Sequence, residues 1–453
     1  MPSLFIFRRD LRLDDNTGLL AALGTSESVM PCFILDPVQV NPHPYRSEFA
    51  FQFMVGSLLD LDARLRELGS RLHIFEGAPA EVVDKLVLRG TITSVHVNRD
   101  YTPYARERDD AIRMVCKQRG IAFVSHRDAL LFEPEDIGRL YRVYSAFRRA
   151  TTGLPSRRPV KRKRANFHSD PHLGDNGDSI DLKKYFATDD TRYARGGRTE
   201  GVKCLKRIRK LGDYENTRDY PALDGTSGLS AHHKFGTVSI RESAAVADAA
   251  MGENSAFYGE LLWRDFFTHV AHHHPHVFGS EFNHSHAGLS WRKEGEKFDR
   301  WCRGETGFPI VDAGMRQLSQ TGTMHNRVRM VVASFLTKDL RVDWRLGERY
   351  FASRLIDYDP CVNNGNWQWA AGTGCDAQPY FRIFNPWRQQ QKFDPQCEYI
   401  KRWVPELADC TAKEIHSLEN TTFQRRYGYP APIVNHKEEA ALTLKMFKRL
   451  RTG

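Results

Sequence analysis

The chain has 453 residues, a formal net charge of +10 and a pI near 9.1. This length exceeds one ordinary hydrophobic core and predicts two or three domains, while the positive charge favours a polyanionic partner such as nucleic acid. No apolar run approaches the roughly 20 residues that span a bilayer, and residues 1–7 lack the charged head and long apolar body of a secretory signal. We therefore expect a soluble, intracellular protein without membrane contact.

The first 130 residues alternate short apolar runs with amphipathic segments. Apolar residues recur at three- and four-residue spacing over 50–68 and 104–119, which is typical of helices. Such alternation predicts a doubly wound, Rossmann-like parallel sheet, although no Gly-x-Gly-x-x-Gly fingerprint follows its first strand. The predicted strands are residues 4–7, 30–35, 72–75, 95–97 and 121–124.

Residues 131–215 are polar, charged and without clear periodicity, which indicates an interdomain connector. Its densest stretch, Pro-Ser-Arg-Arg-Pro-Val-Lys-Arg-Lys-Arg at 155–164, contains six cations. Three interpretations remain open for this stretch: a solvated basic loop, a contact to the DNA backbone, or a nuclear import signal.

Residues 216–453 have the pattern of helices joined by loops and predict an all-α domain. All eight tryptophans lie between residues 263 and 403, and residues 363–369 combine two indoles with several carboxamides. Trp367 and Trp369 would project to the same side of an extended stretch or in well-separated directions on a helix, so that one can face a cofactor and the other a substrate.

Cysteine and histidine spacing gives no support for a metal site. The eight cysteines include no Cys-x-x-Cys pair, so reduced thiols are expected, and the last four lack the short spacings of many iron–sulfur sites. A cluster of histidines at 269–276 contains an i, i+4 pair but no His-Glu-x-x-His arrangement. We expect helix-end or surface histidines there, and no metal.

Six motifs occur in an order that resembles the cryptochrome/photolyase family, flavoenzymes that split ultraviolet-induced pyrimidine dimers. The chain looks most like a class I cyclobutane pyrimidine dimer photolyase. The motifs are Phe-Arg-Arg-Asp-Leu-Arg-Leu-Asp-Asp-Asn at 7–16, Thr-Ser-Gly-Leu-Ser at 226–230, Glu-Leu-Leu-Trp-Arg-Asp-Phe at 260–266, Met-His-Asn-Arg-Val-Arg-Met at 324–330, the double-tryptophan run, and Arg-Ile-Phe-Asn-Pro at 382–386.

The resemblance implies a C-terminal helical domain that binds FAD, active as the reduced, anionic hydroquinone. It implies that Asn363 offers its carboxamide to the redox-active nitrogen of the flavin. A neutral amide tolerates the extra negative charge of the reduced ring, which a carboxylate would oppose. The implied FAD-binding residues are Tyr214, Thr226, Ser227, Gly228, Leu229, Ser230, Phe257, Arg329, Asp357, Tyr358, Asp359 and Asn363.

Three tryptophans match the family's inside-to-surface electron path, in which Trp367, Trp344 and Trp291 return an electron to oxidised flavin. From the residues alone, three core tryptophans explain the pattern equally well, because indoles are commonly buried for packing. Repairing and signalling members of the family both have such triads, so the path does not distinguish them.

A lesion pocket is implied by Glu260 and Trp263, which share one face of a helix, and by Trp369 as a second aromatic wall. The carboxyl group would hydrogen-bond the 5′ base and steady the radical anion, while the indoles pack on a dimer flipped out of the duplex. Asn326 and Met330 replace the histidine pair typical of six-four photolyases and the glutamine of DASH members. The implied phosphate or flanking-strand contacts are Arg218, Arg327, Arg329 and Gln389.

The sequence therefore predicts light-driven repair of cyclobutane pyrimidine dimers in double-stranded DNA by electron transfer from excited reduced FAD, in a monomer located with the DNA in cytoplasm, nucleoid or nucleus. A blue-light photoreceptor of cryptochrome type is the alternative. The chain ends at Gly453 without the long tail through which many cryptochromes signal. Ala105, where the folate-binding branch has glutamate nearby, and Lys234 favour an 8-hydroxy-deazaflavin antenna over a second flavin, folate or none.

Four positions depart from the family pattern. Asp265 stands where glutamate is usual, and Tyr-Ser-Ala-Phe at 144–147 replaces Phe-Thr-Pro-Phe. Thr323 stands where a tryptophan commonly precedes Met-His-Asn-Arg, and Asn366 replaces a glycine in the double-tryptophan run. We expect Thr323 to loosen the pocket wall and to alter efficiency, without removing a named contact.

Overall fold

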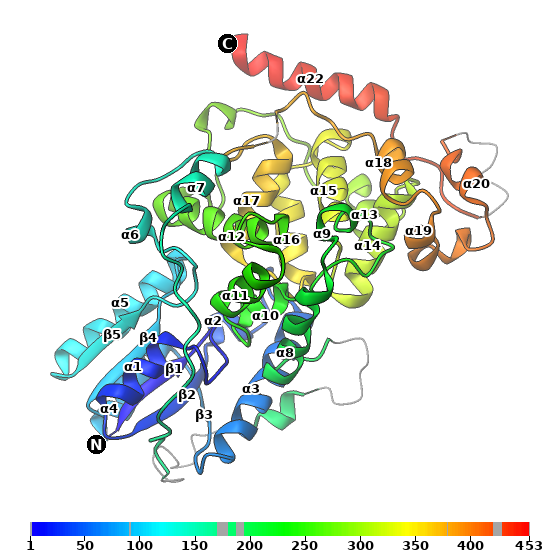
Figure 1. Ribbon diagram of the computed structural model, residues 1–453. Coiled ribbons are helices and arrows are strands. Elements are labelled where there is room, and N and C mark those ends of the chain that lie inside the picture. The colour runs from blue at the N-terminus through cyan, green and yellow to red at the C-terminus, as the bar shows by residue number, and fades with distance from the viewer. Residues whose placement is uncertain are drawn as a thin grey trace. The chain divides into compact units, whose positions relative to one another are not determined.

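The computed structural model describes residues 2–89, 92–169, 180–186, 194–377, 379–419 and 428–452. The chain divides into two compact units, drawn together in Figure 1. Unit 1 comprises Met1–Tyr141, Ser145–Gly212 and Ser227–Pro275, and unit 2 comprises Arg142–Tyr144, Asp213–Thr226 and His276–Gly453. Most of the expected connector thus groups with unit 1, while the sequence-based domain boundaries at 130 and 215 remain predictions about independent domains.

Unit 1 contains a five-stranded parallel sheet with the order β3-β2-β1-β4-β5. Strands β1 and β2 are buried along their whole length, as expected for inner strands covered on both faces. In register, Leu4 pairs with Met30 on one side and Val95 on the other. The predicted strands are confirmed as β1 (Ser3–Phe7), β2 (Val29–Leu35), β3 (His73–Glu76), β4 (Ser94–Asn98) and β5 (Ala122–His126).

Helices connect the strands and cover the sheet (Figure 1). Helix α3 (Glu48–Arg66) begins where the Ser47 hydroxyl accepts a hydrogen bond from the Ala50 amide, which satisfies one of the unpaired donors of the first turn. The predicted helices over 50–68 and 104–119 are confirmed as α3 and α5. Helix α5 spans Pro103–Gln118. The other helices in this part of the chain are α1 (Thr17–Thr25), α2 (Pro37–Val40), α4 (Pro79–Leu88), α6 (Pro134–Ile137), α7 (Tyr144–Thr151), η1 (Leu182–Tyr185), α8 (Arg198–Arg207) and η2 (Ile208–Lys210).

Among the described residues beyond 215, regular structure is helical apart from one isolated bridge between Arg292 and Val342. The predicted all-α C-terminal half is confirmed. Its helices are α9 (Tyr214–Thr217), α10 (Ser230–Phe235), α11 (Ile240–Met251), α12 (Ala256–His273), η3 (Pro275–Val277), η4 (His284–His286), α13 (Glu296–Arg303), α14 (Pro309–Thr321), α15 (Asn326–Ser334), η5 (Phe335–Asp339), α16 (Trp344–Arg354), α17 (Pro360–Ala371), α18 (Pro386–Phe393), α19 (Glu398–Trp403), η6 (Pro405–Leu407), α20 (Ala412–His416) and α22 (His436–Thr452).

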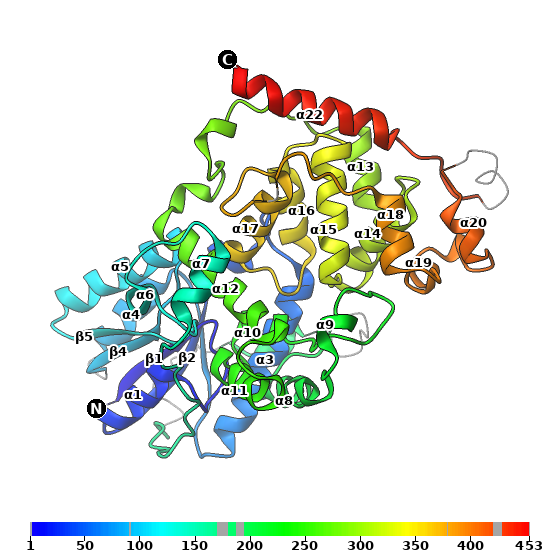
Figure 2. The same cartoon turned by 45° about the horizontal axis from the view of Figure 1, so that its top comes forward.

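The core of unit 2 is built around buried aromatic residues on α13 to α17. Trp301, Phe335, Trp344 and Trp367 are all at most 2% exposed. Helix α22, coloured red in Figures 1 and 2, packs against the π-helical turn η5 of this core. At this contact the Thr443 hydroxyl of α22 donates to the carbonyl oxygen of Lys338 at 2.5 Å. The buried Nζ of Lys338 donates to the carbonyl oxygen of Ala371 at the end of α17, 2.6 Å away.

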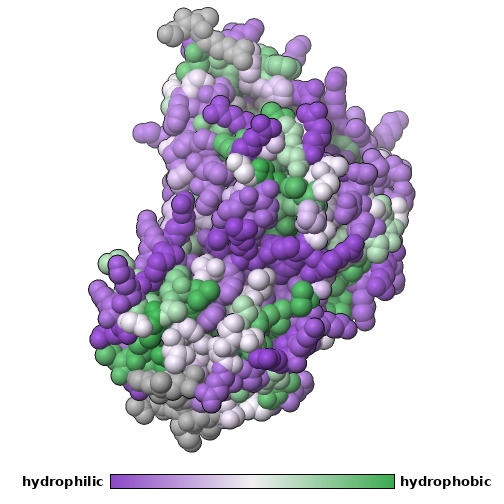
Figure 3. All heavy atoms as spheres, turned by 60° about the vertical axis from the view of Figure 1, so that its left-hand side comes forward, coloured by the Kyte–Doolittle hydropathy of each residue, from purple (hydrophilic) through white to green (hydrophobic). Residues whose placement is uncertain are grey.

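No helix in the described part of the chain is long and apolar enough to cross a membrane. The face drawn in Figure 3 is mostly hydrophilic, and its hydrophobic residues form separate patches.

Candidate functional site

Helix α17 carries three of the proposed functional side chains, Asn363, Trp367 and Trp369. Its first turn is fixed by Asp359, whose carboxylate accepts hydrogen bonds from the amides of Cys361 (3.0 Å) and Val362 (3.1 Å). The predicted divergence of the two indoles is confirmed, because Trp367 is 2% exposed within the core and Trp369 is only partly buried.

The carboxamide of Asn363 has a defined orientation. Its Nδ2 donates to Oε1 of Glu348, on α16, at 3.0 Å, and the hydroxyl of Tyr358 donates to the same oxygen at 3.2 Å. Glu348 is buried, and burial raises its pKa above the ordinary value. Since a carboxylate only accepts hydrogen bonds, the amide nitrogen of Asn363 faces Glu348 and its Oδ1 is left to accept from a ligand.

Asp357 and Arg329, two other proposed FAD contacts, form an ion pair. Arg329 Nη2 lies 2.9 Å from Asp357 Oδ2, and Arg329 Nε donates to the carbonyl oxygen of Met324 at 2.8 Å. The Asp357 side chain is only 5% exposed. Asp357, Tyr358, Asp359 and Asn363 are neighbours in the sequence. Contacts to Arg329 of α15 and Glu348 of α16 hold this stretch in place within unit 2.

The Thr-Ser-Gly-Leu-Ser segment leads into a helix, since α10 begins at Ser230. Gly228 has a φ of +71°, a left-handed conformation that favours glycine, and the Ser227 hydroxyl accepts from the Leu229 amide at 3.3 Å. Thr226 and Tyr214 belong to unit 2, whereas residues 227–230 and Phe257 belong to unit 1.

On α12, in unit 1, Glu260 and Trp263 lie one turn apart on a partly exposed face. The Trp263 ring packs on Phe267 (centroids 5.4 Å apart) and edge-on to Phe266 (5.5 Å). The opposite face of α12 is buried and includes Asp265, and Phe257, one turn before Glu260, is buried as well. The predicted placement of an acid and an indole on one helical face is confirmed.

Asn326 and Met330 also lie one turn apart, on α15 of unit 2; Asn326 is exposed and Met330 is partly exposed. Arg327, which follows Asn326 in the sequence, interacts with other side chains of the protein. Its Nη2 lies 2.7 Å from Asp219 Oδ2, and its guanidinium lies 4.3 Å from the ring centre of Phe393. The Arg218 guanidinium similarly lies 5.4 Å from the ring centre of Tyr214.

Gln389, on α18, differs from these arginines. Its buried Oε1 has no hydrogen-bond partner among the described residues. A buried amide oxygen without a partner is costly, so this atom is suited to accept a hydrogen bond from a bound molecule.

Thr323 and Asn366, which depart from the family pattern, make hydrogen bonds to residues close to them in the sequence. The Thr323 hydroxyl lies 2.8 Å from that of Thr321, within a short turn after α14. Asn366 is exposed, and its Nδ2 donates to the Val362 carbonyl one turn earlier on α17.

The proposed electron path lies in the core of unit 2. Trp344 is 1% exposed, while Trp291 is partly exposed and meets Phe447 of α22 with ring centroids 6.4 Å apart. The ring neighbours of Trp367 include Phe351 (4.9 Å) and Trp301 (6.2 Å). Sequence reasoning assigned no role to Trp301 or to Glu348. Neither residue lies in one of the six motifs, and only the fold places them beside Trp367 and Asn363.

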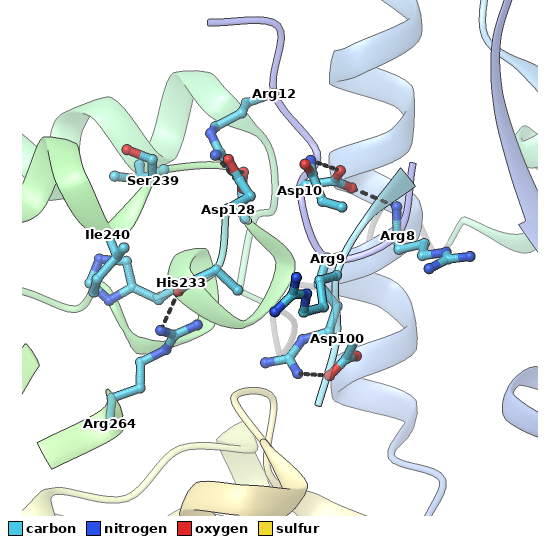
Figure 4. A pocket seen from close by; sticks show the side chains of 15 residues that line it. Arg8, Arg9, Asp10, Arg12, Asp100, Asp128, His233, Ser239, Ile240 and Arg264 are labelled. Atoms are coloured by element: carbon cyan, nitrogen blue, oxygen red, sulfur yellow. Dashed lines mark hydrogen bonds and ion pairs between the residues drawn. The ribbon is translucent and has the colours of Figure 1, made fainter. Parts of the chain in front are cut away.

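A separate pocket lies within unit 1, beyond the carboxyl ends of β1 and β4 (Figure 4). Strand order reverses between these two strands, and such switch points commonly bind ligands in α/β sheets. The cavity is small, about 30 Å³. Its lining residues are Arg8, Arg9, Asp10, Arg12, Asn98, Arg99, Asp100, Asp128, Ala129, His233, Gly236, Val238, Ser239, Ile240 and Arg264.

Ion pairs hold the walls of this pocket. Arg12 Nη2 lies 2.6 Å from Asp128 Oδ2, and Arg9 Nη1 lies 3.4 Å from Asp100 Oδ1. Burial would raise the pKa of Asp128, but Arg12 and Arg241 hold it below the ordinary value. Burial raises the pKa of Asp10 to about 6. Much of the charge in the pocket is therefore neutralised by ion pairs between its own side chains.

Two family models match the chain. "DNA photolyase" matches residues 3–162, and "FAD binding domain of DNA photolyase" matches residues 257–449. A deoxyribodipyrimidine photo-lyase from Vibrio cholerae is 38% identical over 470 residues, covering 98% of this chain and 98% of that protein.

Solved structures are similar over nearly the whole chain. A photolyase from Sulfolobus tokodaii with two FAD molecules has a TM-score of 0.89 and 43% identity, covering 99% of this chain and 100% of that one. A cryptochrome from Synechocystis has a TM-score of 0.89 and 29% identity, covering 98% and 99%.

Proposed function

Because the chain belongs to the cryptochrome/photolyase family, we propose that it is a deoxyribodipyrimidine photo-lyase that repairs cyclobutane pyrimidine dimers in double-stranded DNA by light. The observation that carries the proposal is the pairing of an acid and an indole, Glu260 and Trp263, on the partly exposed face of α12, in a chain that matches such enzymes over its whole length.

The described residues fit FAD. Asn363 Oδ1 is free to accept from a ring N–H because Glu348 holds the amide nitrogen, and Asp357 is held in place by Arg329. The backbone turn at Gly228 precedes α10, where free amides can receive a phosphate. Bound, reduced FAD would supply the light-excited electron that this repair chemistry needs.

The lesion contacts of the proposal fall into two sets. Glu260 hydrogen-bonds the 5′ base and Trp263 stacks on the flipped dimer, whereas Asn326, Met330 and Trp369 in unit 2 contribute an amide, a thioether and a second indole. The side chains at 326 and 330 favour a cyclobutane dimer over a six-four photoproduct. Trp367, Trp344 and Trp291 are proposed to carry electrons to oxidised flavin.

The direct test is repair by purified, chemically reduced protein under blue light. The substrate is an oligonucleotide with one cyclobutane thymine dimer, compared with a dark sample and with a six-four substrate. We expect light-dependent loss of the cyclobutane dimer and no repair of the six-four product. If the FAD-loaded, reduced protein leaves the cyclobutane dimer intact under blue light, the proposal is contradicted.

The alternative is a cryptochrome-type photoreceptor, which the similarity to the Synechocystis cryptochrome keeps open. The same assay distinguishes the two functions, since a receptor without repair activity undergoes flavin photoreduction but leaves the dimer intact.

A second chromophore would act as an antenna, and 8-hydroxy-deazaflavin is our preference over flavin or folate. Ala105 is buried, and its methyl group cannot make the hydrogen bond to a pterin that a glutamate would make, while the carbonyl oxygen of Lys234 accepts from Arg9 Nε at 3.2 Å. The cavity of Figure 4 is too small for a three-ring chromophore, so we do not assign the antenna to it. Extraction of the purified protein, with mass spectrometry of the released chromophores, would identify deazaflavin, a second flavin, folate or none.

A further inference from the structure

The basic run at residues 155–164, here called the basic strap, is held firmly within unit 1 although it forms neither helix nor strand. Val160 and Asp15 exchange two hydrogen bonds: the Asp15 amide donates to the Val160 carbonyl oxygen (2.7 Å), and the Val160 amide donates to Asp15 Oδ1 (2.9 Å). The Arg162 amide donates to Asp14 Oδ1 at 3.0 Å. The backbone of the strap is thus fixed to the turn after β1.

Three arginines of the strap contact the protein; one of them, Arg164, donates from Nη1 to the carbonyl oxygen of Gly24 at 3.0 Å. Arg157 donates from Nη1 to the Arg127 carbonyl and from Nη2 to the Leu130 carbonyl, both at 2.8 Å. Arg162 places its guanidinium 5.7 Å from the ring centre of Phe167. These side chains anchor the strap.

Three other cations, Arg158, Lys161 and Lys163, point into solvent. Within the described residues, no hydrogen bond or salt bridge engages their side chains. Lys161 and Lys163 lie on either side of Arg162 in the sequence, and both side chains are exposed. The strap therefore displays cationic groups whose backbone is already ordered.

We propose that the basic strap is a docking surface for the sugar–phosphate backbone of duplex DNA, distinct from the lesion contacts. The proposal rests on the DNA-directed function proposed above. Residues 158–163 can span at most about 18 Å, at about 3.6 Å per residue. One strand of B-DNA presents a phosphate about every 3.4 Å of helix axis, so about five phosphates lie along this length.

Charge rather than apolar contact is what the strap offers. Residues 155–164 include no aromatic residue, and Val160, 51% exposed, is its only large hydrophobic side chain. Protein-binding surfaces are usually built around buried aromatic or aliphatic anchors. A polyanion held by phosphate contacts fits the strap better than a folded protein partner.

The first test uses the triple variant Arg158→Gln, Lys161→Gln, Lys163→Gln in the full FAD-loaded protein. Its matched control is Lys85→Gln, Arg106→Gln, Lys117→Gln, which removes three exposed cations from α4 and α5 of the same unit. Both variants lower the net charge by three. Affinity for an undamaged 30-base-pair duplex is measured by fluorescence anisotropy over a series of salt concentrations.

We expect the strap variant to reduce the log–log salt slope by about two to three, at about 0.9 for each phosphate that is no longer neutralised, and the control to change it by less than one. Equal changes in the two variants would indicate a general charge effect and overturn the proposal. An unchanged salt slope in the strap variant would overturn the proposal. If the same variant also binds poly-glutamate more weakly than wild type, an acidic polypeptide is the better partner for the strap.

A second readout locates the contact. Acetylation of lysines, followed by mass spectrometry, should show Lys161 and Lys163 protected by duplex DNA, with Lys85 and Lys117 as unprotected references. Equal labelling with and without duplex contradicts docking at the strap. Because binding to undamaged duplex needs no light, failure of the wild-type protein to repair dimers would reject the proposed function while leaving this result standing.

Discussion

Single side chains far from any motif orient the residues proposed for catalysis. Glu348 is the clearest case, because one buried oxygen receives both the amide of Asn363 and the hydroxyl of Tyr358. Without that acceptor, the two ends of the Asn363 carboxamide become nearly equivalent, and a flavin N–H would meet a donor as often as an acceptor.

We expect Glu348→Leu to weaken FAD binding by at least tenfold, since loss of a hydrogen bond to a charged group costs about 1.5–3 kcal/mol. Glu348→Gln is the matched control, because its amide oxygen can still accept from Asn363. Reconstitution of apoprotein with FAD, followed by flavin fluorescence, measures both. Equal affinity in the Leu variant and wild type would show that Glu348 does not act through Asn363.

Trp263→Ala should weaken binding of a dimer-containing oligonucleotide by about 5- to 150-fold, because stacking of a base on an aromatic side chain is worth about 1–3 kcal/mol. Trp263→Phe keeps a stacking face and should lose much less. Glu260→Ala should instead lower repair per absorbed photon with a smaller change in affinity. An unaltered dissociation constant for Trp263→Ala would remove this indole from the pocket.

At the scale of elements, α12 carries the proposed lesion contacts on one face and packs against the protein with the other. Asp265 on the buried face accepts hydrogen bonds from the amides of Leu131 (2.8 Å) and Phe132 (3.0 Å), so it ties α12 to the segment that precedes α6. Burial raises its pKa to about 7, against partial compensation by Arg264, and nearby Glu133 adds to the rise.

The raised pKa of Asp265 predicts a pH-dependent stability. Between about pH 4 and 7 the folded protein retains a proton that the unfolded chain releases, so this group's contribution to stability decreases as pH rises. Asp265→Asn removes the dependence, and its stability relative to wild type should increase by up to about 4 kcal/mol from pH 4 to 7, at about 1.4 kcal/mol per pH unit. Denaturant unfolding measures the difference. Asp409→Asn, at an exposed site, is the matched control.

The packing of α16 on α17 depends on Gly347. A Cβ at this position would lie 2.3 Å from Cη2 of Trp367 and 2.5 Å from Leu336. We therefore expect Gly347→Ala to lower the free energy of unfolding by about 1–3 kcal/mol, as for other overpacked cores.

Gly24→Ala provides the control for this substitution, because Gly24 is also helical but a Cβ there meets no atom within 4 Å. It should leave stability unchanged or raise it slightly. Thermal unfolding of both variants tests the difference. Equal midpoints would mean that the core beside Trp367 can relax.

At the scale of the whole molecule, the net charge of +10 predicts that binding to undamaged duplex falls steeply with salt, while the added preference for damaged DNA comes from stacking that salt barely affects. Replacing Trp369 with Ala should shrink the preference for damaged DNA and leave the salt slope unchanged.

Arg327→Gln should reduce the salt slope on damaged duplex by about one. In the protein this arginine is paired with Asp219, so DNA must compete for it or share it. Anisotropy on matched damaged and undamaged duplexes separates the two effects. An equal loss of preference in the Trp369 and Arg327 variants would contradict the division between aromatic pocket and phosphate contact.

Local pattern was sufficient for the strands, the major helices and the pairing of Glu260 with Trp263, because side-chain periodicity and helical spacing are properties of neighbouring residues. The family resemblance named the remaining candidate residues, whose roles in binding and catalysis stay predictions. Only the tertiary structure shows contacts between residues that are distant in the sequence. Arg329 pairs with Asp357, Glu348 orients Asn363, and the basic strap is hydrogen-bonded to the turn after β1. These contacts join residues 15 to 145 positions apart, and their formation depends on burial and on the path of the backbone rather than on the identity of adjacent residues.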